Sequence, residues 1–171
     1  MNTLRSNSRR AAAARRLQRG VAAIEFALVF VFLFSVLYGV ATFGAVLYTQ
    51  QAVTRAAEEG ARAVGLLTTP AATAGDTRVK DVVYDALANS LVVPTSANAN
   101  ATSRRNWIVS QVTVDVTAGA PGSPGAYVSY MVTVTYPYSA NRLLPSMMVL
   151  DTSRWMPDQL RSRASAALRS S

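Results

Sequence analysis

The sequence contains no cysteine and no histidine. These two absences exclude disulfide bonds, zinc sites of the usual nitrogen and sulfur type, and catalysis by a cysteine or a histidine. Lysine occurs once, at Lys80. We expect this residue on the exposed side of a helix. No pair of residues stands out as a general acid and base. We therefore expect no metal site, no cofactor and no enzymatic activity.

Acidic residues are absent from residues 1–20, a segment that carries six arginines. The whole chain has 17 basic and 9 acidic residues, and its formal net charge is +8. A charge of this size is typical of nucleic-acid-binding proteins, but most of the excess lies in this short leader. From Val21 onward the charges nearly balance, so we expect no nucleic-acid partner.

Charged residues are also absent from Phe26 to Thr54. Within this stretch, residues 26–48 read "FALVFVFLFSVLYGVATFGAVLY", an apolar run that as a helix would be about 35 Å long. A helix of that length crosses the hydrocarbon core of a bilayer, which is about 30 Å thick. The alternative, a secretory signal peptide, has an apolar part of only about 7 to 15 residues. The sequence therefore predicts a transmembrane helix over residues 21–48.

The position of the arginines predicts the orientation of this helix. All six in the leader precede the apolar run, and positively charged flanks stay on the cytoplasmic side of a membrane. We therefore interpret residues 1–20 as a cytoplasmic basic leader and expect the C-terminal part of the chain to be extracytoplasmic.

A stripe of small residues at helical spacing follows on residues 49–67, the expected extracytoplasmic extension of the helix. Alanine and glycine allow another helix to approach closely, so the stripe is a candidate packing surface. The stripe can pack against the chain's own domain, which we favour, or against another subunit. The candidate packing residues are Ala56, Ala57, Gly60 and Ala61.

The rest of the chain is expected to be a linker and a small extracytoplasmic domain. Residues 68–75, "TTPAATAG", have the proline, glycine and small polar residues of a linker, and residues 76–171 form the domain. A second, amphipathic helix begins near Asp76 and ends before Pro94. Its Asp81 and Asp85 are expected in surface ion pairs with the basic residues beside them, Arg78 and Lys80.

Two strands are predicted by alternation of apolar and polar residues, in "IVSQVTVDVT" and in "YVSYMVTVTY". The loop "AGAPGSPGA" joins them as a long antiparallel hairpin, while Asn98–Asn106 is polar and turn-prone. Residues 160–168 fit a third strand, but "RASAALR" is equally acceptable as a helix by propensity. The expected fold class is α+β: a long membrane helix, a second helix and a small antiparallel sheet.

Glu25 is unusual because it lies just inside the apolar run. A carboxylate beside the bilayer core costs on the order of a few kcal/mol if it is unpaired, so it is a functional candidate by default. The alternative is that its side chain reaches back to the lipid headgroups.

The whole arrangement around this glutamate resembles the processing site of type IV prepilin-like proteins. A basic stretch precedes Gly20, four residues separate it from Glu25, and Phe26 begins the apolar run. In such proteins a membrane-embedded prepilin peptidase cuts after the glycine and leaves a glutamate at the fifth position. The resemblance implies Gly20 and Val21 as processing residues, and Glu25 and Phe26 as assembly residues.

More specifically, the chain resembles the TadE-like family of pseudopilins of the tight-adherence (Tad, type IVc) pilus. The resemblance is carried by "RGVAAIEFALV", by "FG" at Phe43 and Gly44, and by "AAEEGARAVGL", which begins at Ala56. Major pilins of this system commonly have tyrosine where this chain has Phe26, and they are much shorter. Both departures favour a minor pseudopilin with a pilin-like fold.

The resemblance also implies partners and a location. The chain would be a single-pass protein of a bacterial inner membrane, needed to assemble pili that serve adhesion and secretion. Its partners would be the prepilin peptidase, other Tad pilins and pseudopilins, the inner-membrane platform and the lipid bilayer. The alternative from another class is a permanently anchored extracytoplasmic binding module that keeps residues 1–20 and never enters a fibre.

Overall fold

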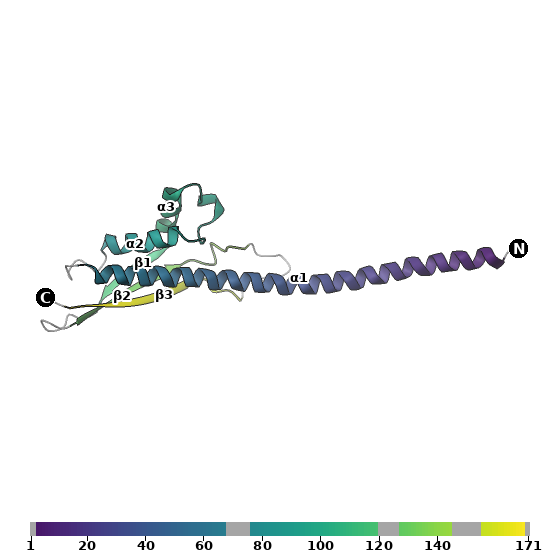
Figure 1. Cartoon of the computed structure of the whole chain (residues 1–171), viewed down its shortest axis with the longest axis horizontal. Coiled ribbons are helices and arrows are strands. Elements are labelled where there is room, and N and C mark those ends of the chain that lie inside the picture. The colour runs from purple at the N-terminus through teal and green to yellow at the C-terminus, as the bar shows by residue number, and fades with distance from the viewer. Residues whose placement is uncertain (1–2, 68–75, 120–126, 145–154, 170–171) are drawn as a thin grey trace. The chain divides into compact units, whose positions relative to one another are not determined.

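The computed structural model describes residues 3–67, 76–119, 127–144 and 155–169. The predicted linker over residues 68–75 and most of the loop predicted between the first two strands lie outside the described residues. The chain divides into two compact units, Met1–Phe43 and Gly44–Ser171. One helix, α1 (Thr3–Gly65), contributes to both (Figure 1).

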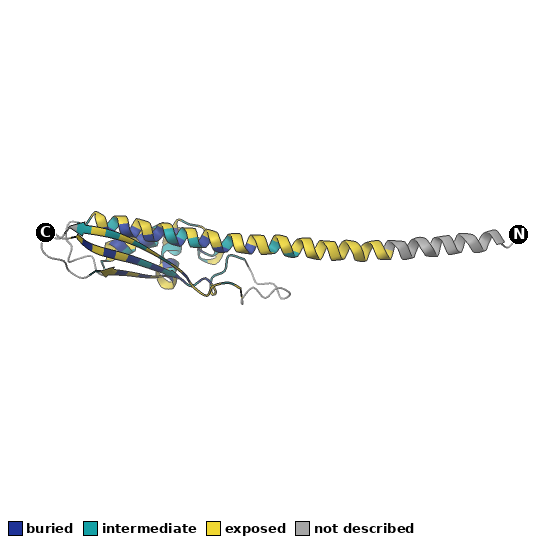
Figure 2. Cartoon of the chain, turned by 90° about the horizontal axis from the view of Figure 1, so that it is seen from below, coloured by how far each residue is buried: buried dark blue, intermediate teal, exposed yellow. Residues whose placement is uncertain are grey.

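In the first unit, α1 presents its apolar side chains to the outside. Large side chains from Val21 to Val40 are exposed, as the yellow stretch of the helix in Figure 2 shows. The hydroxyl group of Ser35 in this stretch is satisfied within the helix, since it donates to the carbonyl oxygen of Val31 at 2.8 Å. Such a bond within the helix satisfies a polar side chain without a partner from the second unit.

The second unit holds the remaining elements. Asp76 caps α2, because its side chain accepts a hydrogen bond from the Arg78 amide at 2.8 Å, and the side chain of Asn100 caps α3 through Ser103 at 2.7 Å. The three strands form one antiparallel sheet in the order β1-β2-β3. The elements are α2 (Thr77–Ala88), the short 3-10 helix η2 (Thr95–Ala97), α3 (Ala101–Gln111), β1 (Thr113–Ala118), β2 (Tyr127–Tyr136) and β3 (Leu160–Arg169).

The central strand β2 gives the sheet one buried and one open face. Its even-numbered residues from Val128 to Tyr136 are buried, and its odd-numbered residues are exposed or half-buried. The register extends both faces across the sheet, because Val132 pairs with Val116 of β1 and with Ala164 of β3. The alternating colours of the strands in Figure 2 follow this period of two.

The core of the second unit lies where α1, α2 and β2 meet. At Gly60 of α1 an added Cβ would lie 2.6 Å from a methyl carbon of Val83 in α2 and 3.1 Å from one of Val132 in β2. Only a residue without a side chain fits such a close approach of a helix to its neighbours. The fully buried aliphatic residues around this point include Val53, Val64, Val79, Leu87, Ile108 and Val134.

The structure confirms the α+β class and the antiparallel pairing of the two predicted strands. The expectation of a turn-prone segment at Asn98–Asn106 is wrong, because α3 covers most of it. The first strand also begins later than predicted, since Ile108 and Gln111 belong to α3. The open alternative at residues 160–168 is decided in favour of a strand by its pairing with β2. The second helix ends at Ala88, and Leu91 beyond it is 74% exposed.

Candidate processing and assembly site

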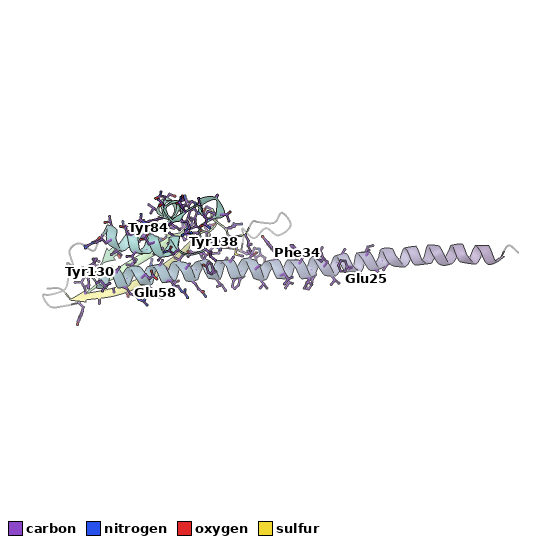
Figure 3. All side chains as sticks on the ribbon, turned by 45° about the horizontal axis from the view of Figure 1, so that its top comes forward. Glu25, Phe34, Glu58, Tyr84, Tyr130 and Tyr138 are labelled. Carbon is purple, nitrogen blue, oxygen red and sulfur yellow. The ribbon has the colours of Figure 1, made fainter. Side chains whose placement is uncertain are left out.

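The predicted processing and assembly residues all lie on α1 in the first unit. Gly20, Val21, Glu25 and Phe26 are exposed, and Figure 3 shows Glu25 projecting from the helix. The part of α1 from Gly20 to Gly65 is the one helix among the described residues that is long and apolar enough to cross a membrane. Its most apolar stretch is not buried at all.

Glu25 is a single acidic group among apolar neighbours. Ile24 and Phe26 beside it are 69% and 70% exposed, so the chain itself covers neither. Among the side chains that the structure describes, which begin at Gly20, Glu25 has no ion-pair partner. The carboxylate is therefore available to a positive group that comes from outside the described chain.

Phe26 is the first of three phenylalanines that stack along one side of the helix. The ring centroids of Phe26 and Phe30 are 6.1 Å apart, and so are those of Phe30 and Phe34, with interplanar angles of 25° and 19°. The spacing of four residues brings successive rings to the same face of a helix. Sequence analysis named only Phe26, although this spacing was visible in the sequence.

Gly20 and Gly60 lie in opposite surroundings on the same helix. A Cβ added to Gly20 would meet nothing within 4 Å, whereas one added to Gly60 would strike the core. The packing of the chain thus explains glycine at position 60 and gives no reason for glycine at position 20. In a helix interior glycine costs about 1 kcal/mol relative to alanine, so glycine at position 20 lowers the local stability of the helix.

The small-residue stripe on α1 is buried inside the second unit. Ala56 and Ala57 are at most 1% exposed, and Ala61 is 6% exposed. Together with Gly60 they pack against this chain's own α2 and sheet. The opposite side of α1 carries Glu58, which is exposed and points away from the core in Figure 3.

Asp81 and Asp85 of α2 form surface ion pairs, but not with the predicted partners. Arg105 of α3 donates from Nε to Asp85 at 2.7 Å and from its terminal nitrogen to Asp81. The hydrogen bond to Asp85 raises the pKa of Arg105. Arg78 instead pairs with Asp76 at 2.9 Å and lowers the pKa of that carboxyl group. Among the described residues no cluster of three or more possible metal ligands exists.

The comparison with known families points to the segment that contains these residues. One family model matches the chain from Gly20 to Arg62, a segment that includes Glu25, Phe26 and the buried small residues. Residues 20–62 match the family model of the TadE-like protein. The resemblance to TadE-like proteins predicted from the sequence is confirmed over this segment. No curated protein and no solved structure matches the chain.

Proposed function

We propose that this chain is a TadE-like minor pseudopilin that a prepilin peptidase cleaves after Gly20 and that serves in the assembly of a Tad pilus. The observation that carries the proposal is the family match, which begins at Gly20 and includes Glu25 at the fifth position after it. Adhesion and secretion would be the tasks of the assembled pilus. In this role the chain has no catalytic activity of its own and requires no cofactor.

The surroundings of Gly20 support cleavage at this position. The fold leaves open space where a side chain would be, so glycine here is not needed for packing within the chain. A peptidase must bind its substrate in an extended conformation, and a residue without a side chain admits an extended backbone to a narrow site. Cleavage would begin with local unwinding of α1 at Gly20.

Cleavage would give Glu25 the positive partner that it lacks among the described side chains. The cut creates an α-amino group on Val21, and a free amine of this kind is protonated at neutral pH. In apolar surroundings an unpaired carboxylate or ammonium group is costly, so the two attract each other strongly. The Glu25 carboxylate of one subunit would pair with the Val21 amine of its neighbour.

The exposed apolar side chains of the first unit fit this assembly. Before assembly, lipid would cover Phe26, Phe30 and Phe34, in the orientation with residues 1–20 in the cytoplasm. During assembly, helices of other pilins and pseudopilins would replace lipid on part of this surface. The partners are therefore the bilayer of the bacterial inner membrane, the prepilin peptidase, the other subunits and the inner-membrane platform.

Two variants test the two halves of the proposal. Gly20→Leu should leave the precursor uncut because the side chain blocks entry to the peptidase, and Glu25→Ala should be cut normally but incorporated poorly. The measurements are the N-terminus of the membrane-extracted protein by mass spectrometry and its fraction in sheared pili. Gly39→Leu is a matched control, since a Cβ there also meets nothing within 4 Å.

Each outcome has a definite meaning. A chain that begins at Val21 in the wild type and at Met1 in Gly20→Leu supports the processing step. A wild-type chain that still begins at Met1, in cells that hold its own prepilin peptidase, contradicts it and favours the permanently anchored binding module. Normal incorporation of Glu25→Ala would reduce Glu25 to an ordinary interfacial charge.

A further inference from the structure

Among the described residues, β3 is an edge strand with no neighbouring strand on its outer side. In an antiparallel sheet, successive residues of a strand direct their N–H and C=O groups alternately to one side and to the other. The Gly119 amide donates to the Ser129 carbonyl at 2.7 Å. The backbone groups of the odd-numbered residues of β2 therefore bond to β1, and those of the even-numbered residues bond to β3. Val132 of β2 pairs with Ala164 of β3. The backbone N–H and C=O groups of the odd-numbered residues of β3 therefore point outward, away from β2.

A hydrogen bond from α1 agrees with this assignment. The side chain of Gln50 donates to the carbonyl oxygen of Arg161 at 3.3 Å, which requires that this carbonyl point outward. Further along β3, the outward groups belong to Arg163, Ser165 and Ala167. Among the residues that the structure describes, no strand pairs with this edge.

The open edge adjoins a groove. Residues 164–166 of β3 and the α1 residues Glu58, Ala61, Arg62 and Gly65 line a hollow of about 320 Å³. The β3 side chains there are alanine and serine, so no bulky group blocks a chain that approaches the edge. An open edge of this kind is a template for the addition of another strand.

The charges beside the edge define the chemistry of the added strand. Arg161 and Arg163 are exposed on the open face of β3, and Lys80 lies with them around a hollow of about 460 Å³. The carboxylate in this group is Asp115 of β1, so the hollow is positively charged on balance. Opposite charges on neighbouring strands attract, and like charges repel.

These charges disfavour a second copy of this chain as the partner. Two β3 edges that pair antiparallel form one continuous sheet, so the arginines of both copies would lie on the same face. In registers centred on Ser162 or Arg163, arginines of the two copies would lie directly opposite each other, which is unfavourable. A strand of opposite charge has no such penalty.

We propose that the outer edge of β3 binds an extended acidic segment of another polypeptide by strand addition, with its acidic side chains at alternate positions beside Arg161 and Arg163. The backbone of Arg163, Ser165 and Ala167 supplies the ladder hydrogen bonds. Side chains at the intervening positions enter the groove between β3 and α1. The site belongs to the second unit alone and does not depend on cleavage after Gly20, so either proposal can fail without the other.

The test uses the full-length protein in detergent micelles and synthetic peptides as long as β3. One peptide alternates glutamate and valine, a second alternates lysine and valine, and a third repeats the first with N-methylated amides on the residues that face the edge. The glutamate peptide should slow hydrogen exchange at the amides of Arg163, Ser165 and Ala167 and bind about tenfold more tightly than the lysine peptide. The methylated peptide should not bind.

Charge-reversal variants separate edge binding from general attraction. The double variant Arg161→Glu/Arg163→Glu should prefer the lysine peptide, whereas Arg55→Glu, an exposed arginine of α1, should leave the preference unchanged. Absence of protection at the three amides would overturn the proposal, and so would equal binding of the glutamate and lysine peptides. Protection in peptide-free protein that sediments as a dimer would identify a second copy as the occupant instead.

Discussion

The two halves of α1 share one backbone conformation but differ in what covers their side chains. In the first unit Phe26 is 70% exposed and Val29 is 61% exposed, whereas in the second unit Val53 and Val64 are fully buried. Helix propensity does not explain this contrast, because both halves are helical throughout. The difference lies in what covers each half, since the described chain leaves the apolar surface of the first half exposed, whereas the second half packs on its own sheet.

Side-chain size separates the two halves as clearly as exposure does. Large residues such as Phe30 and Phe34 dominate the exposed half, and their bulk suits lipid or another helix. The buried half uses Ala56, Ala57 and Gly60 against α2 and β2, which lets the backbones approach closely. One helix thus serves as a candidate membrane segment and as part of a domain core, by a change in residue size along its length.

A buried charge should have the largest effect and should act on one half only. Val53→Asp places a carboxylate in the core without a partner and should destabilise the second unit by about 4 kcal/mol or more. Val29→Asp should leave that unfolding unchanged but lower membrane retention, because a charge in a membrane helix costs about 3 kcal/mol to insert. Denaturant unfolding, monitored by tryptophan fluorescence, measures the stability of the second unit. Carbonate extraction measures membrane retention. If Val29→Asp also unfolded the second unit, the two halves would not be independent.

Substitution of a buried glycine should lower the unfolding free energy by less than a buried charge does, and substitution of an exposed glycine should change it little. Gly60→Leu drives a side chain into Val83 and Val132 and should cost about 2 kcal/mol of unfolding free energy, as overpacking does. The matched control Gly44→Leu meets open space and should change it little. Chemical denaturation of the two purified variants in detergent measures the difference. Equal losses in the two variants would mean that the close contacts of Gly60 do not set the requirement for glycine.

The sequence predicted those parts of the fold that have a strong pattern. The absence of charge from Phe26 to Thr54 predicted the long apolar helix, and alternation predicted β2 in full. Glu25 was selected because a carboxylate is unusual beside an apolar run, whereas Gly20 was selected through the resemblance to prepilin-like proteins. Such patterns are local, so they can be read without knowledge of the tertiary structure.

The sequence did not predict the parts that depend on tertiary contacts. Helix α3 has no apolar stripe, since Ile108 is its only fully buried residue, although the cap from Asn100 to Ser103 was a usable signal. Strand β3 is rich in alanine and arginine, and only its pairing with β2 selects a strand. Likewise, no pattern along the chain could show that Arg105 of α3 binds both aspartates of α2.

The smallest expected change in unfolding free energy comes from the loss of one buried hydrogen bond in the second unit. In the exposed half the Ser35 hydroxyl bonds within the helix, to the carbonyl of Val31 at 2.8 Å, whereas the Tyr136 hydroxyl donates to the carbonyl of the distant residue Val92 at 2.9 Å. Tyr136→Phe removes this bond and should cost about 1 kcal/mol at neutral pH, measured by urea unfolding. Tyr127→Phe, on a 74% exposed residue, is the matched control.

Alkaline pH sharpens this last prediction. Burial raises the pKa of Tyr136 in the folded state, while an unfolded tyrosine keeps its ordinary pKa of about 10. The folded state therefore binds the proton more tightly than the unfolded state does. The stability that Tyr136 contributes is complete below the unfolded pKa of about 10, and it is lost as the pH rises from there toward the folded pKa. Tyr136→Phe has no such proton to lose, so its deficit against the wild type should narrow between pH ~8 and pH ~11. A deficit that stayed constant with pH would show that the proton of the buried hydroxyl is not linked to folding.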